Sequence, residues 1–223
     1  MQIYLVRHGE SQANVDGSIH VHTADHAIPL SERGERQADA AGVFLHGHFQ
    51  SLGESFGKVR LWNSPYRRAR QTADAIERRI AGFVQDRHEH LLLCEQQFGL
   101  FDGITDEASR LEIIRKYPDE YEHYKKCERF EGSFWARMPL GESKFDLSTR
   151  VHQSFGTFHR DLAKSGIENI VIVAHGSTNR AFIMMWLHHP FEWFGKERNP
   201  LNCSVRLISD NKDLGYVYEG GTE

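Results

Sequence analysis

The chain has 223 residues, of which 39% are hydrophobic and 26% charged, and this balance is typical of a soluble protein with one α/β domain. Its formal net charge of -4 provides no overall basic field, so we expect no nucleic-acid partner. Cys94, Cys127 and Cys203 lie far apart, which favours reduced thiols in a cytoplasmic protein over a disulfide framework or a zinc site. No apolar run approaches the roughly 20 residues that span a bilayer, and no secretory leader precedes the first strand, so we expect no membrane association.

The first predicted strand, residues 3–6, is a run of four apolar residues. It ends at Arg7 and His8, and Gly9 interrupts it. Ligand sites in open α/β sheets lie outside the carboxyl ends of the strands, so we expect this strand to place Arg7 and His8 in a site. Residues 12–29 show no sustained periodicity, and we expect them to form a long loop over that site.

Two helices are predicted next, each from the residue type at its start. Ser31 is typical of an N-cap, and we expect a helix to begin at Glu32. After a short strand at residues 59–62, Ser64 and Pro65 predict a second helix, with Ser64 as the N-cap and Pro65 in the first helical position.

The middle of the chain contains a third predicted strand and an insertion. Residues 91–94 are apolar and predict a strand that carries Glu95 at its carboxyl end. Residues at about 104–140 are rich in charge and partly helical, and we interpret them as a helical insertion in a single domain formed by the whole chain. A long helix is predicted from residue 142 to residue 164.

The C-terminal part repeats the pattern of the first strand. Residues 170–174 are apolar, and His175 and Gly176 follow them directly. Two such strands in one sheet can bring His8 and His175 into one pocket. The remaining predicted elements are a helix after Gly176 and two short strands, around residues 204–208 and 216–218. Because strands alternate with helices along the chain, we expect a three-layer α/β sandwich, a mostly parallel sheet with helices on both faces.

The predicted strand ends deliver a set of side chains that suits phosphoryl transfer. The set is Arg7, His8, Glu95 and His175, with Arg67, Arg68 and Arg70 from the helix after the second strand. Guanidinium groups bind phosphate oxygens in a bidentate way, and a neutral imidazole can act as a nucleophile toward phosphorus. A carboxyl group can protonate the leaving oxygen and then activate water.

Four motifs, in this order, resemble those of the histidine phosphatase superfamily, in its phosphoglycerate-mutase-like branch. They are Arg7-His8-Gly9, residues 64–73, residues 95–99 and His175-Gly176, and together they extend over almost the whole chain. The resemblance implies an enzyme, a phosphoric monoester hydrolase of the histidine acid phosphatase type, that uses no metal and no other cofactor.

The resemblance also implies roles for individual residues. His8 is the expected nucleophile, which becomes a phosphohistidine, and Glu95 is the expected proton donor. Three further residues are expected to hold the phosphoryl oxygens: Arg7, Arg68 and His175. Arg68 is preferred to its neighbours Arg67 and Arg70 because it is third after Pro65, as in the family motif.

Three additional residues near these motifs are candidates for substrate binding. Asn14 matches a phosphate-contacting position of the family, six residues after the nucleophile. Gly176 belongs to the last motif. Ser11, close to the nucleophile, either donates a hydrogen bond to phosphate or makes a hydrogen bond within its own loop.

Several stretches resemble plant and fungal phosphoglycerate-mutase-like proteins more closely than the glycolytic mutase. These stretches are residues 24–34, 95–101, 137–143 and 199–202. The sequence lacks two substrate-binding signatures of the glycolytic mutase: a Gly-Trp-x-Asp after the nucleophile loop, and a paired Arg-Arg before a Pro-rich run. These differences argue against a glycolytic role but not against phosphohistidine chemistry.

Other residues have two interpretations. Three histidines share one loop: His20, His22 and His26. Such a cluster invites a metal site, but no regular ligand spacing accompanies it, and we interpret these histidines as solvated or as residues of the pocket rim. Asp25 and His26 can also touch substrate. Phe134, Trp135 and Arg137 either form a lid that selects the substrate or pack locally.

We therefore expect a phosphomonoester hydrolase that forms a phosphohistidine at His8 and releases inorganic phosphate. Two rival interpretations stay open. The first is a mutase or another phosphotransferase, in which an alcohol replaces water, and the second is a non-catalytic phosphate-binding module. The motifs do not identify the phosphorylated substrate, whether small molecule or phosphoprotein, because loops and the insertion select it.

Overall fold

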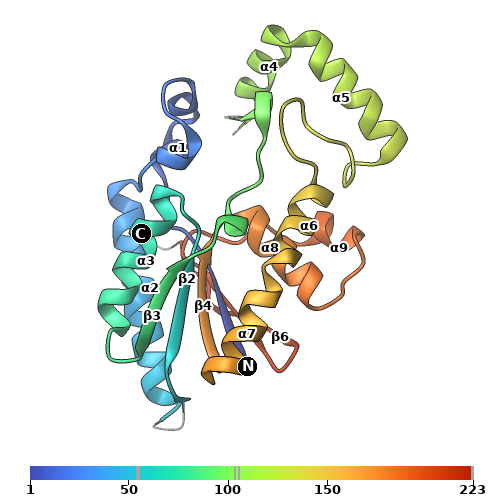
Figure 1. Ribbon diagram of the computed structural model, residues 1–223. Coiled ribbons are helices and arrows are strands. Elements are labelled where there is room, and N and C mark those ends of the chain that lie inside the picture. The colour runs from blue at the N-terminus through green and yellow to red at the C-terminus, as the bar shows by residue number, and fades with distance from the viewer. Residues whose placement is uncertain (54–55, 103, 105, 222–223) are drawn as a thin grey trace.

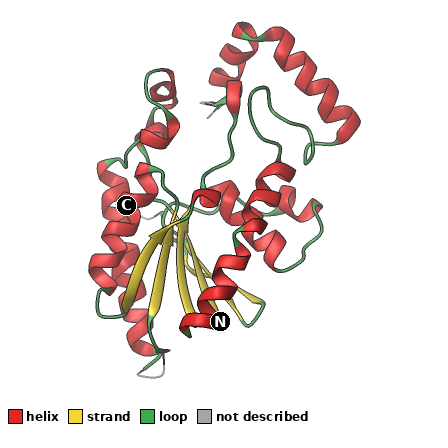
Figure 2. Ribbon diagram, in the orientation of Figure 1, coloured by secondary structure: helices red, strands yellow, loops and turns green. Residues whose placement is uncertain are grey.

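A six-stranded sheet with helices on both faces forms the centre of the protein, seen here in a computed structural model (Figure 1, Figure 2). The structure describes residues 1–53, 56–102, 104 and 106–221. The strands are β1 (Gln2–Arg7), β2 (Val59–Asn63), β3 (Val84–Glu89), β4 (Asn169–Ala174), β5 (Val205–Ser209) and β6 (Lys212–Tyr218). Their order in the sheet is β3-β2-β4-β1-β5-β6.

The two strands that carry His-Gly motifs are neighbours in this sheet. β1 and β4 pair in parallel, in a register that places Arg7 opposite Ala174. The residues that follow, His8 and His175, therefore leave the same edge of the sheet next to each other. β2 and β3 continue the parallel part, while β5 is antiparallel to both β1 and β6. The predicted mostly parallel sheet is confirmed.

Two apolar cores separate the sheet from the helices that cover it. The helices α2 (Glu32–Ser51) and α3 (Arg67–Ile80) lie on one face, and α6 (Lys144–Gln153), α7 (Phe155–Ser165) and α8 (Gly176–Trp186) lie on the other (Figure 1). Successive side chains of a strand point to opposite faces. Tyr4 and Val6 accordingly pack in the core beneath α2 and α3, whereas Ile3 and Leu5 pack in the core beneath α7 and α8. These two cores confirm the predicted three-layer sandwich.

Two segments extend beyond the carboxyl ends of the parallel strands (Figure 1). The predicted loop after β1 is more ordered than expected: it contains α1 (Gln12–Val15) and the 3₁₀ helices η1 (Gly17–Val21) and η2 (Asp25–Ala27). The region that we interpret as an insertion contains α4 (Glu107–Lys116) and α5 (Pro118–Glu131), and α9 (Glu192–Lys196) lies near its base. Across the described residues, no helix combines the length and the apolar character needed to cross a membrane.

The prediction of the third strand was wrong. Residues 91–94 do not form a strand: Leu91–Leu93 is the 3₁₀ helix η4, and the third strand is β3 (Val84–Glu89). β3 lies at the edge of the sheet, pairs only with β2, and leaves its side chains half-buried or exposed. A polar sequence is compatible with such a position, so an apolar run does not mark it. Glu95 is consequently carried by the segment after η4.

Two helix boundaries also differ from the prediction. α3 begins at Arg67 with Tyr66 as its N-cap, so Ser64 and Pro65 precede the helix. The predicted long helix is divided into α6 and α7 at Ser154, whose hydroxyl donates to the carbonyl of Val151 at 2.6 Å. A serine that bonds the backbone of the preceding turn competes with regular helical bonding. The other predicted strands are present, with β6 longer than expected at its start.

Candidate active site

A cavity of about 570 Å³ lies at the carboxyl ends of β1 and β4. Segments far apart in the sequence line it: the residues after β1, the loop around η2, the start of α3, the segment after η4, α4, α5, and the starts of α6 and α8. The predicted residues among its lining are Arg7, His8, Ser11, Asn14, Arg68 and Glu95. His175 and Gly176 are buried and do not line it.

His8 is held in one tautomer by the backbone carbonyl of the next residue, Gly9. Its Nδ1 lies 2.7 Å from the carbonyl oxygen of Gly9. A carbonyl oxygen only accepts hydrogen bonds, so Nδ1 carries the proton and Nε2 presents its lone pair. Nε2 accepts a hydrogen bond from Nε of Arg68 at 3.3 Å. Burial, together with the charges of Arg68 and Arg7, holds the pKa of His8 well below its usual value. The imidazole is therefore neutral, as a nucleophile must be.

The turn that carries His8 depends on a glycine. A Cβ atom at Gly9 would lie 2.4 Å from the carbonyl oxygen of Gly34 in the first turn of α2. The backbone of the loop that carries His8 therefore packs directly against the backbone of α2, and no residue larger than glycine fits at position 9. This close approach explains the need for glycine after His8 in physical terms.

His175 lies against His8, and their ring centroids are 5.0 Å apart. Its Nε2 is 2.8 Å from the hydroxyl of Ser64, while its Nδ1 is buried without a described hydrogen-bond partner. Burial, with the charge of Arg68 as the next cause, holds the pKa of His175 well below its usual value. If the Ser64 hydroxyl donates to Nε2, Nδ1 carries a proton for which the described residues provide no acceptor.

The two predicted arginines differ in their partners. Arg7 donates to the carbonyl of Pro200 at 2.6 Å, and its buried Nε has no described partner. Arg68 is already occupied by a carboxylate: its two terminal nitrogens bond to the two oxygens of Asp25 at 2.8 and 3.1 Å. A phosphoryl group uses guanidinium donors in the same bidentate way. Arg67 is exposed and Arg70 pairs with Glu89 on the surface, so the structure places Arg68 in the site and its neighbours outside it.

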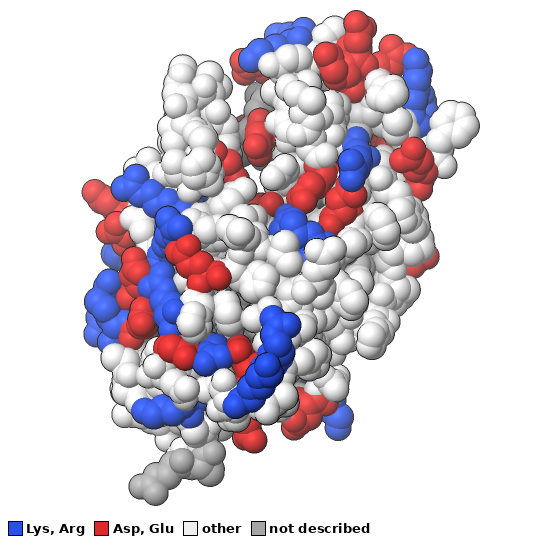
Figure 3. Space-filling model, viewed as in Figure 1, with Lys and Arg blue, Asp and Glu red and all other residues white. Residues whose placement is uncertain are grey.

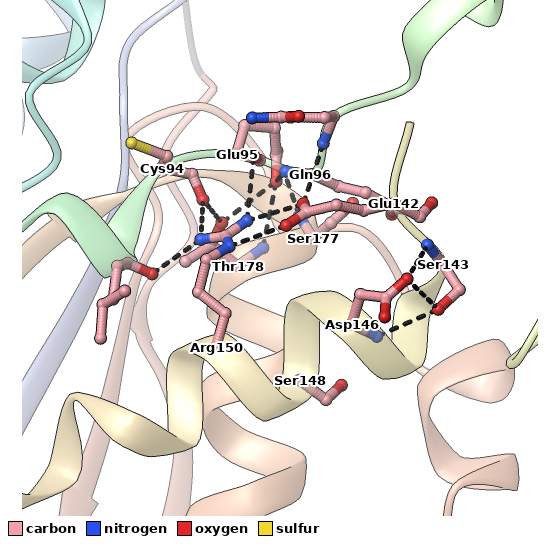
Figure 4. A network of polar contacts seen from close by, with 12 residues as sticks. Cys94, Glu95, Gln96, Glu142, Ser143, Asp146, Ser148, Arg150, Ser177 and Thr178 are labelled. Carbon is pink, nitrogen blue, oxygen red and sulfur yellow. Dashed lines mark hydrogen bonds and ion pairs between the residues drawn. The ribbon is translucent and has the colours of Figure 1, made fainter. Parts of the chain in front are cut away.

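Glu95 lies against the N-terminus of α8 (Figure 4). Its oxygens accept hydrogen bonds from the backbone N–H groups of Gln96 (2.9 Å), Ser177 (3.3 Å) and Thr178 (3.2 Å), and the Thr178 hydroxyl is 3.1 Å away. The N-terminus of a helix carries unpaired donors and a partial positive charge that attract a carboxylate. These contacts fix the carboxyl group at the wall of the cavity.

Arg150, which the sequence did not indicate, fastens the segment that carries Glu95 (Figure 4). Its guanidinium donates to the carbonyls of Leu92 (2.8 Å), Cys94 (3.0 Å) and Glu95 (3.2 Å). It also forms a bidentate pair with Glu142 at 2.9 and 2.8 Å. All of its donors face this segment and Glu142.

Of the remaining substrate-binding candidates, Ser11 and Asn14 line the cavity and Gly176 does not. Ser11 and Asn14 form the capping box of α1, in which the Ser11 hydroxyl accepts from the N–H of Asn14 and the Asn14 side chain accepts from the N–H of Ser11. The structure thus shows the loop hydrogen bond that was one of the two interpretations of Ser11. Gly176 is the first residue of α8, and a Cβ atom there would lie 2.3 Å from the Asn199 side chain.

The residues considered for a lid pack locally instead. Phe134 is buried against Trp135 and Phe191, and Arg137 pairs with Asp146 on the surface. None of these residues lines the cavity. The cavity wall is completed by other residues of that region and of the segment before it: Phe98, Phe101, Asp102, Ile104, Arg110, Tyr121, Tyr124, Lys125 and Met138.

Of the histidine cluster, His20 lines the cavity, 3.9 Å from Asp25, and His22 and His26 do not. Within the described part of the chain, no three His, Cys, Asp or Glu side chains gather closely enough to hold a common metal ion. Asp102, which also lines the cavity, has a pKa raised to about 6 by burial and by the negative charge of Asp25.

Paired imidazoles, converging guanidinium groups and a carboxyl group at the strand ends of an α/β sandwich define a site for phosphoryl transfer. The family model of the histidine phosphatase superfamily (branch 1) matches residues 3–217, and the chain belongs to this superfamily.

Curated relatives and solved structures agree with this membership. The chain is similar to phosphoglycerate mutase-like protein AT74 of Arabidopsis thaliana, with 34% identity over 220 residues that cover 93% of this chain and 64% of AT74. It is 31% identical to AT74H of the same organism over 233 residues, which cover 97% of this chain and 76% of AT74H. The α-ribazole phosphatase of Shigella flexneri has a similar structure, with a TM-score of 0.69 and 22% identity over 98% of this chain and 96% of that one.

Proposed function

We propose that this chain is a phosphomonoester hydrolase that forms a phosphohistidine at Nε2 of His8. The observation that carries the proposal is the hydrogen bond between His8 Nδ1 and the Gly9 carbonyl, which directs the Nε2 lone pair into a group of cations. Membership in the histidine phosphatase superfamily supports the proposal. The AT74 proteins are larger than the matched region, so the proposal concerns this chain alone.

The first step is an in-line displacement at phosphorus. Nε2 of His8 forms a bond to phosphorus while the bond between phosphorus and the ester oxygen breaks, and Glu95 gives its proton to that oxygen. In the second step, water attacks the phosphohistidine, Glu95 takes a proton from the water, and the bond between Nε2 and phosphorus breaks. The products are an alcohol and inorganic phosphate, and His8 and Glu95 return to their initial states.

Donors around His8 stabilise the charge on the phosphoryl oxygens in both steps. Arg7 and Arg68 contribute guanidinium groups, His175 contributes a ring N–H, and Asn14 contributes its side-chain amide. Charge stabilisation of this kind provides most of the catalysis in phosphoryl transfer. Because the chain itself supplies these two guanidinium groups and the other hydrogen-bond donors, we propose that the reaction needs no metal ion and no other cofactor.

The substrates that we propose are phosphorylated small molecules or phosphoproteins. The name of the Shigella flexneri protein, an α-ribazole phosphatase with the same fold, is consistent with hydrolysis of a phosphate ester. We also propose a cytoplasmic protein that binds neither nucleic acid nor membranes, because the net charge of -4 disfavours a polyanionic partner and the three widely spaced cysteines favour a reducing compartment.

Trapping of the intermediate tests the proposal. During turnover of an aryl phosphate carrying ³²P, an alkaline quench should retain label, and peptide mapping should place it on His8. His8→Ala should abolish both labelling and turnover, whereas His152→Ala, which changes an exposed histidine of α6, should preserve both. Label on a different residue, with His8→Ala still active, would refute the mechanism.

The same preparation separates hydrolase from phosphotransferase. If the chain is a hydrolase, added acceptor alcohols at moderate concentration should not become phosphorylated. Efficient transfer to one alcohol would establish the mutase or phosphotransferase alternative, and absence of labelling and turnover with every phosphate ester would establish a binding module.

A further inference from the structure

The orientation of the His8 ring depends on the peptide group between Gly9 and Glu10. The carbonyl of this peptide, that of Gly9, accepts the hydrogen bond from Nδ1 of His8 at 2.7 Å. Arg68 donates to Nε2 at 3.3 Å, which is longer than an ordinary hydrogen bond, so the bond to Gly9 is the stronger restraint on the ring. The direction of this carbonyl therefore governs where Nε2 points.

Gly9 cannot hold its own carbonyl in place. Glycine has no Cβ and adopts many backbone conformations, so it restrains the peptide that follows it very little. The preceding peptide is anchored at both ends: the Thr72 hydroxyl accepts from the N–H of Gly9 at 3.0 Å, and the Asn202 amide donates to the carbonyl of His8 at 3.0 Å. The peptide between Gly9 and Glu10 needs an anchor of its own.

Gln37 of α2 provides this anchor. The N–H of Glu10, at the other end of the same peptide, donates to Oε1 of Gln37 at 2.9 Å. Among the residues that the structure describes, no other group accepts a hydrogen bond from this N–H. A peptide group is planar and rigid, so a partner that fixes its N–H also fixes its C=O.

The start of α2 is fastened to the same turn, which gives Gln37 a fixed position. Gln37 lies one helical turn after Gly34 and faces the same side of the helix. A Cβ atom at Gly34 would lie 2.0 Å from the carbonyl oxygen of Glu10, so the two backbones are in contact. Ser31, the N-cap of α2, donates from its N–H to that carbonyl at 2.9 Å and from its hydroxyl to the Glu10 carboxylate at 2.7 Å.

Packing does not explain a glutamine at this position. Only 4% of the Gln37 surface is exposed, and Gln37 is the one polar residue among the buried residues of α2, a helix that the structure describes in full. Burial of an amide costs free energy unless the amide forms hydrogen bonds, so an apolar side chain would suit this face better. The bond to the turn accounts for the amide.

We propose that Gln37 is a positioning residue of the phosphatase, which fixes the Gly9 carbonyl through the N–H of Glu10 and so aims Nε2 of His8 at phosphorus. The inference rests on the proposed phosphohistidine chemistry and adds a residue to it. As the Nε2 lone pair becomes the bond to phosphorus and the ester oxygen leaves, the proton stays on Nδ1 and the ring gains positive charge. The bond to the Gly9 carbonyl is then charge-assisted and stronger, so its direction matters most in the transition state.

Gln37→Met tests this role, because methionine has a similar size and no acceptor oxygen. At saturating aryl phosphate, the single-turnover rate of His8 labelling should fall about tenfold or more, since a small displacement of a reacting atom is costly. An alkyl phosphate should slow by a similar factor, because both esters are attacked by the same Nε2. The inhibition constant of inorganic phosphate should change less than about twofold, since Arg7 and Arg68 are unchanged.

A second readout observes the imidazole directly. In protein labelled with ¹⁵N in its histidine rings, long-range ¹H–¹⁵N correlation spectra distinguish a ring nitrogen that carries a proton from one that carries a lone pair. Of the 14 histidines, His8 is identified by the signals that are missing from His8→Ala. In the original protein Nδ1 should be protonated and Nε2 unprotonated. In Gln37→Met the two signals should move toward each other as the tautomers mix.

Gln71→Met is the matched control. Gln71 is a half-buried glutamine of α3 whose Oε1 accepts from the N–H of Leu30, also at 2.9 Å, outside the turn that carries His8. Its loss should lower the melting temperature as Gln37→Met does, but should leave the labelling rate and the His8 signals unchanged. Gln37→Glu keeps an acceptor oxygen and should restore labelling to within about threefold of the original rate.

Each outcome bears on the inference separately from the phosphatase activity. Slower labelling together with mixed tautomers, in Gln37→Met and not in Gln71→Met, supports it. Unchanged His8 signals in Gln37→Met, an unchanged labelling rate, or equal changes in Gln71→Met would overturn it and leave phosphohistidine formation intact. Absence of label from the original protein would instead refute the proposed function, and the inference with it.

Discussion

Asp25 is the carboxylate partner of Arg68, the arginine that we propose to bind phosphate. Its carboxylate accepts hydrogen bonds from both terminal nitrogens of Arg68, and its backbone carbonyl accepts a further hydrogen bond from the same guanidinium at 2.7 Å. A phosphoryl group must share or displace this contact. Asp25 lies in η2, within the segment of short helices after β1, so movement of that segment would release Arg68.

We predict that Asp25→Asn binds inorganic phosphate more tightly. The amide cannot form a charged pair with Arg68, so competition for the guanidinium decreases, and the inhibition constant of phosphate should fall about fivefold, on the order of 1 kcal/mol. The control is Asp102→Asn, which removes a negative charge from the same cavity without a contact to Arg68. Equal effects of the two variants would point to general electrostatics, and weaker binding in Asp25→Asn would show that Asp25 positions Arg68 instead.

Asp102 links the stability of the fold to pH. Its pKa is raised from the ordinary 3.8 to about 6, first by burial and then by the charge of Asp25. A carboxyl group with a raised pKa in the folded state stabilises the fold below its unfolded pKa and loses that contribution as pH rises through the folded pKa. The relevant window therefore extends from about pH 4 to about pH 6.

We predict that Asp102→Asn stabilises the protein only above this window. Its free energy of unfolding should equal that of the original protein near pH 4 and exceed it by about 2 kcal/mol near pH 8, as measured by urea denaturation at both values. Asp39→Asn should behave in the opposite direction, because Arg79 holds the pKa of Asp39 below its ordinary value. A gain for Asp102→Asn that is the same at both pH values would contradict the prediction.

At the scale of elements, the position of Glu95, the proton donor that we propose, depends on contacts between segments far apart in the chain. Arg150 of α6 holds the carbonyls around Glu95, and α8 holds its carboxylate. The backbones also pack directly, since a Cβ atom at Gly99 would lie 2.1 Å from the carbonyl of Pro139. Gly99 has a positive φ of 59°, which favours glycine as well. Residues 95–99 and 139–142 are thus fastened together just before α6.

We predict that Arg150→Met impairs proton donation more than phosphate binding. Loss of its contacts lets Glu95 move, so turnover of an alkyl phosphate, a poor leaving group, should fall about 10- to 100-fold, toward the 10²–10⁴-fold typical of a lost general acid and expected for Glu95→Gln. Activated aryl phosphates need little protonation and should be affected much less. Phosphate inhibition should be retained.

Two further variants test whether the effect of Arg150→Met is specific to proton donation. Arg160→Met changes an exposed arginine of α7 and should leave both substrates unaffected. Because Arg150→Met leaves Glu142 without its partner, the double variant Arg150→Met with Glu142→Gln removes the unpaired charge. If alkyl and aryl phosphates slow equally in the double variant, Arg150 serves folding alone.

Local sequence patterns predicted the strands that are buried on both faces and missed one strand at the edge of the sheet, β3. β1 and β4 are continuous apolar runs because helices cover both sides, and their ends placed His8 and His175 correctly in one site. β3 is an edge strand with a polar sequence, so the apolar residues of η4 were mistaken for it. Glu95 was nevertheless found, because its motif, rather than a strand end, identified it.

Residues whose role depends on tertiary pairing had no local signature. Lys144 and Arg180 are separated by 36 positions and line the same cavity because α6 and α8 pack side by side on the same face of the sheet. Asp25 was considered for substrate contact, but its pairing with Arg68 across 43 positions could not be inferred from either segment. Spacing along one helix did separate Arg68 from Arg67 and Arg70, since neighbouring residues point about 100° apart.

At the scale of the whole molecule, the arrangement of charge distinguishes the cavity from the outer surface. Acidic and basic side chains are interspersed over the face seen in Figure 3, without a large area of one sign. The cavity, in contrast, is lined by six Lys and Arg residues and by three Asp and Glu residues. A cavity with an excess of positive charge inside a mixed surface raises the local concentration of anionic ligands without attracting polyanions to the exterior.

This arrangement predicts that activity survives removal of divalent ions. Many phosphatases use metal ions to neutralise the phosphoryl oxygens and to activate water, whereas here the guanidinium groups of Arg7 and Arg68 are placed to supply that charge. After dialysis against EDTA, kcat/KM for an aryl phosphate should change less than about twofold, and added Mg²⁺, Mn²⁺ or Zn²⁺ should not increase it. Raised ionic strength should weaken phosphate binding, because screening acts on charged side chains and ligand alike. Complete loss of turnover in EDTA, restored by one divalent ion at stoichiometric concentration, would instead assign a metal site to the histidines around His20 and the carboxylates of Asp25 and Asp102.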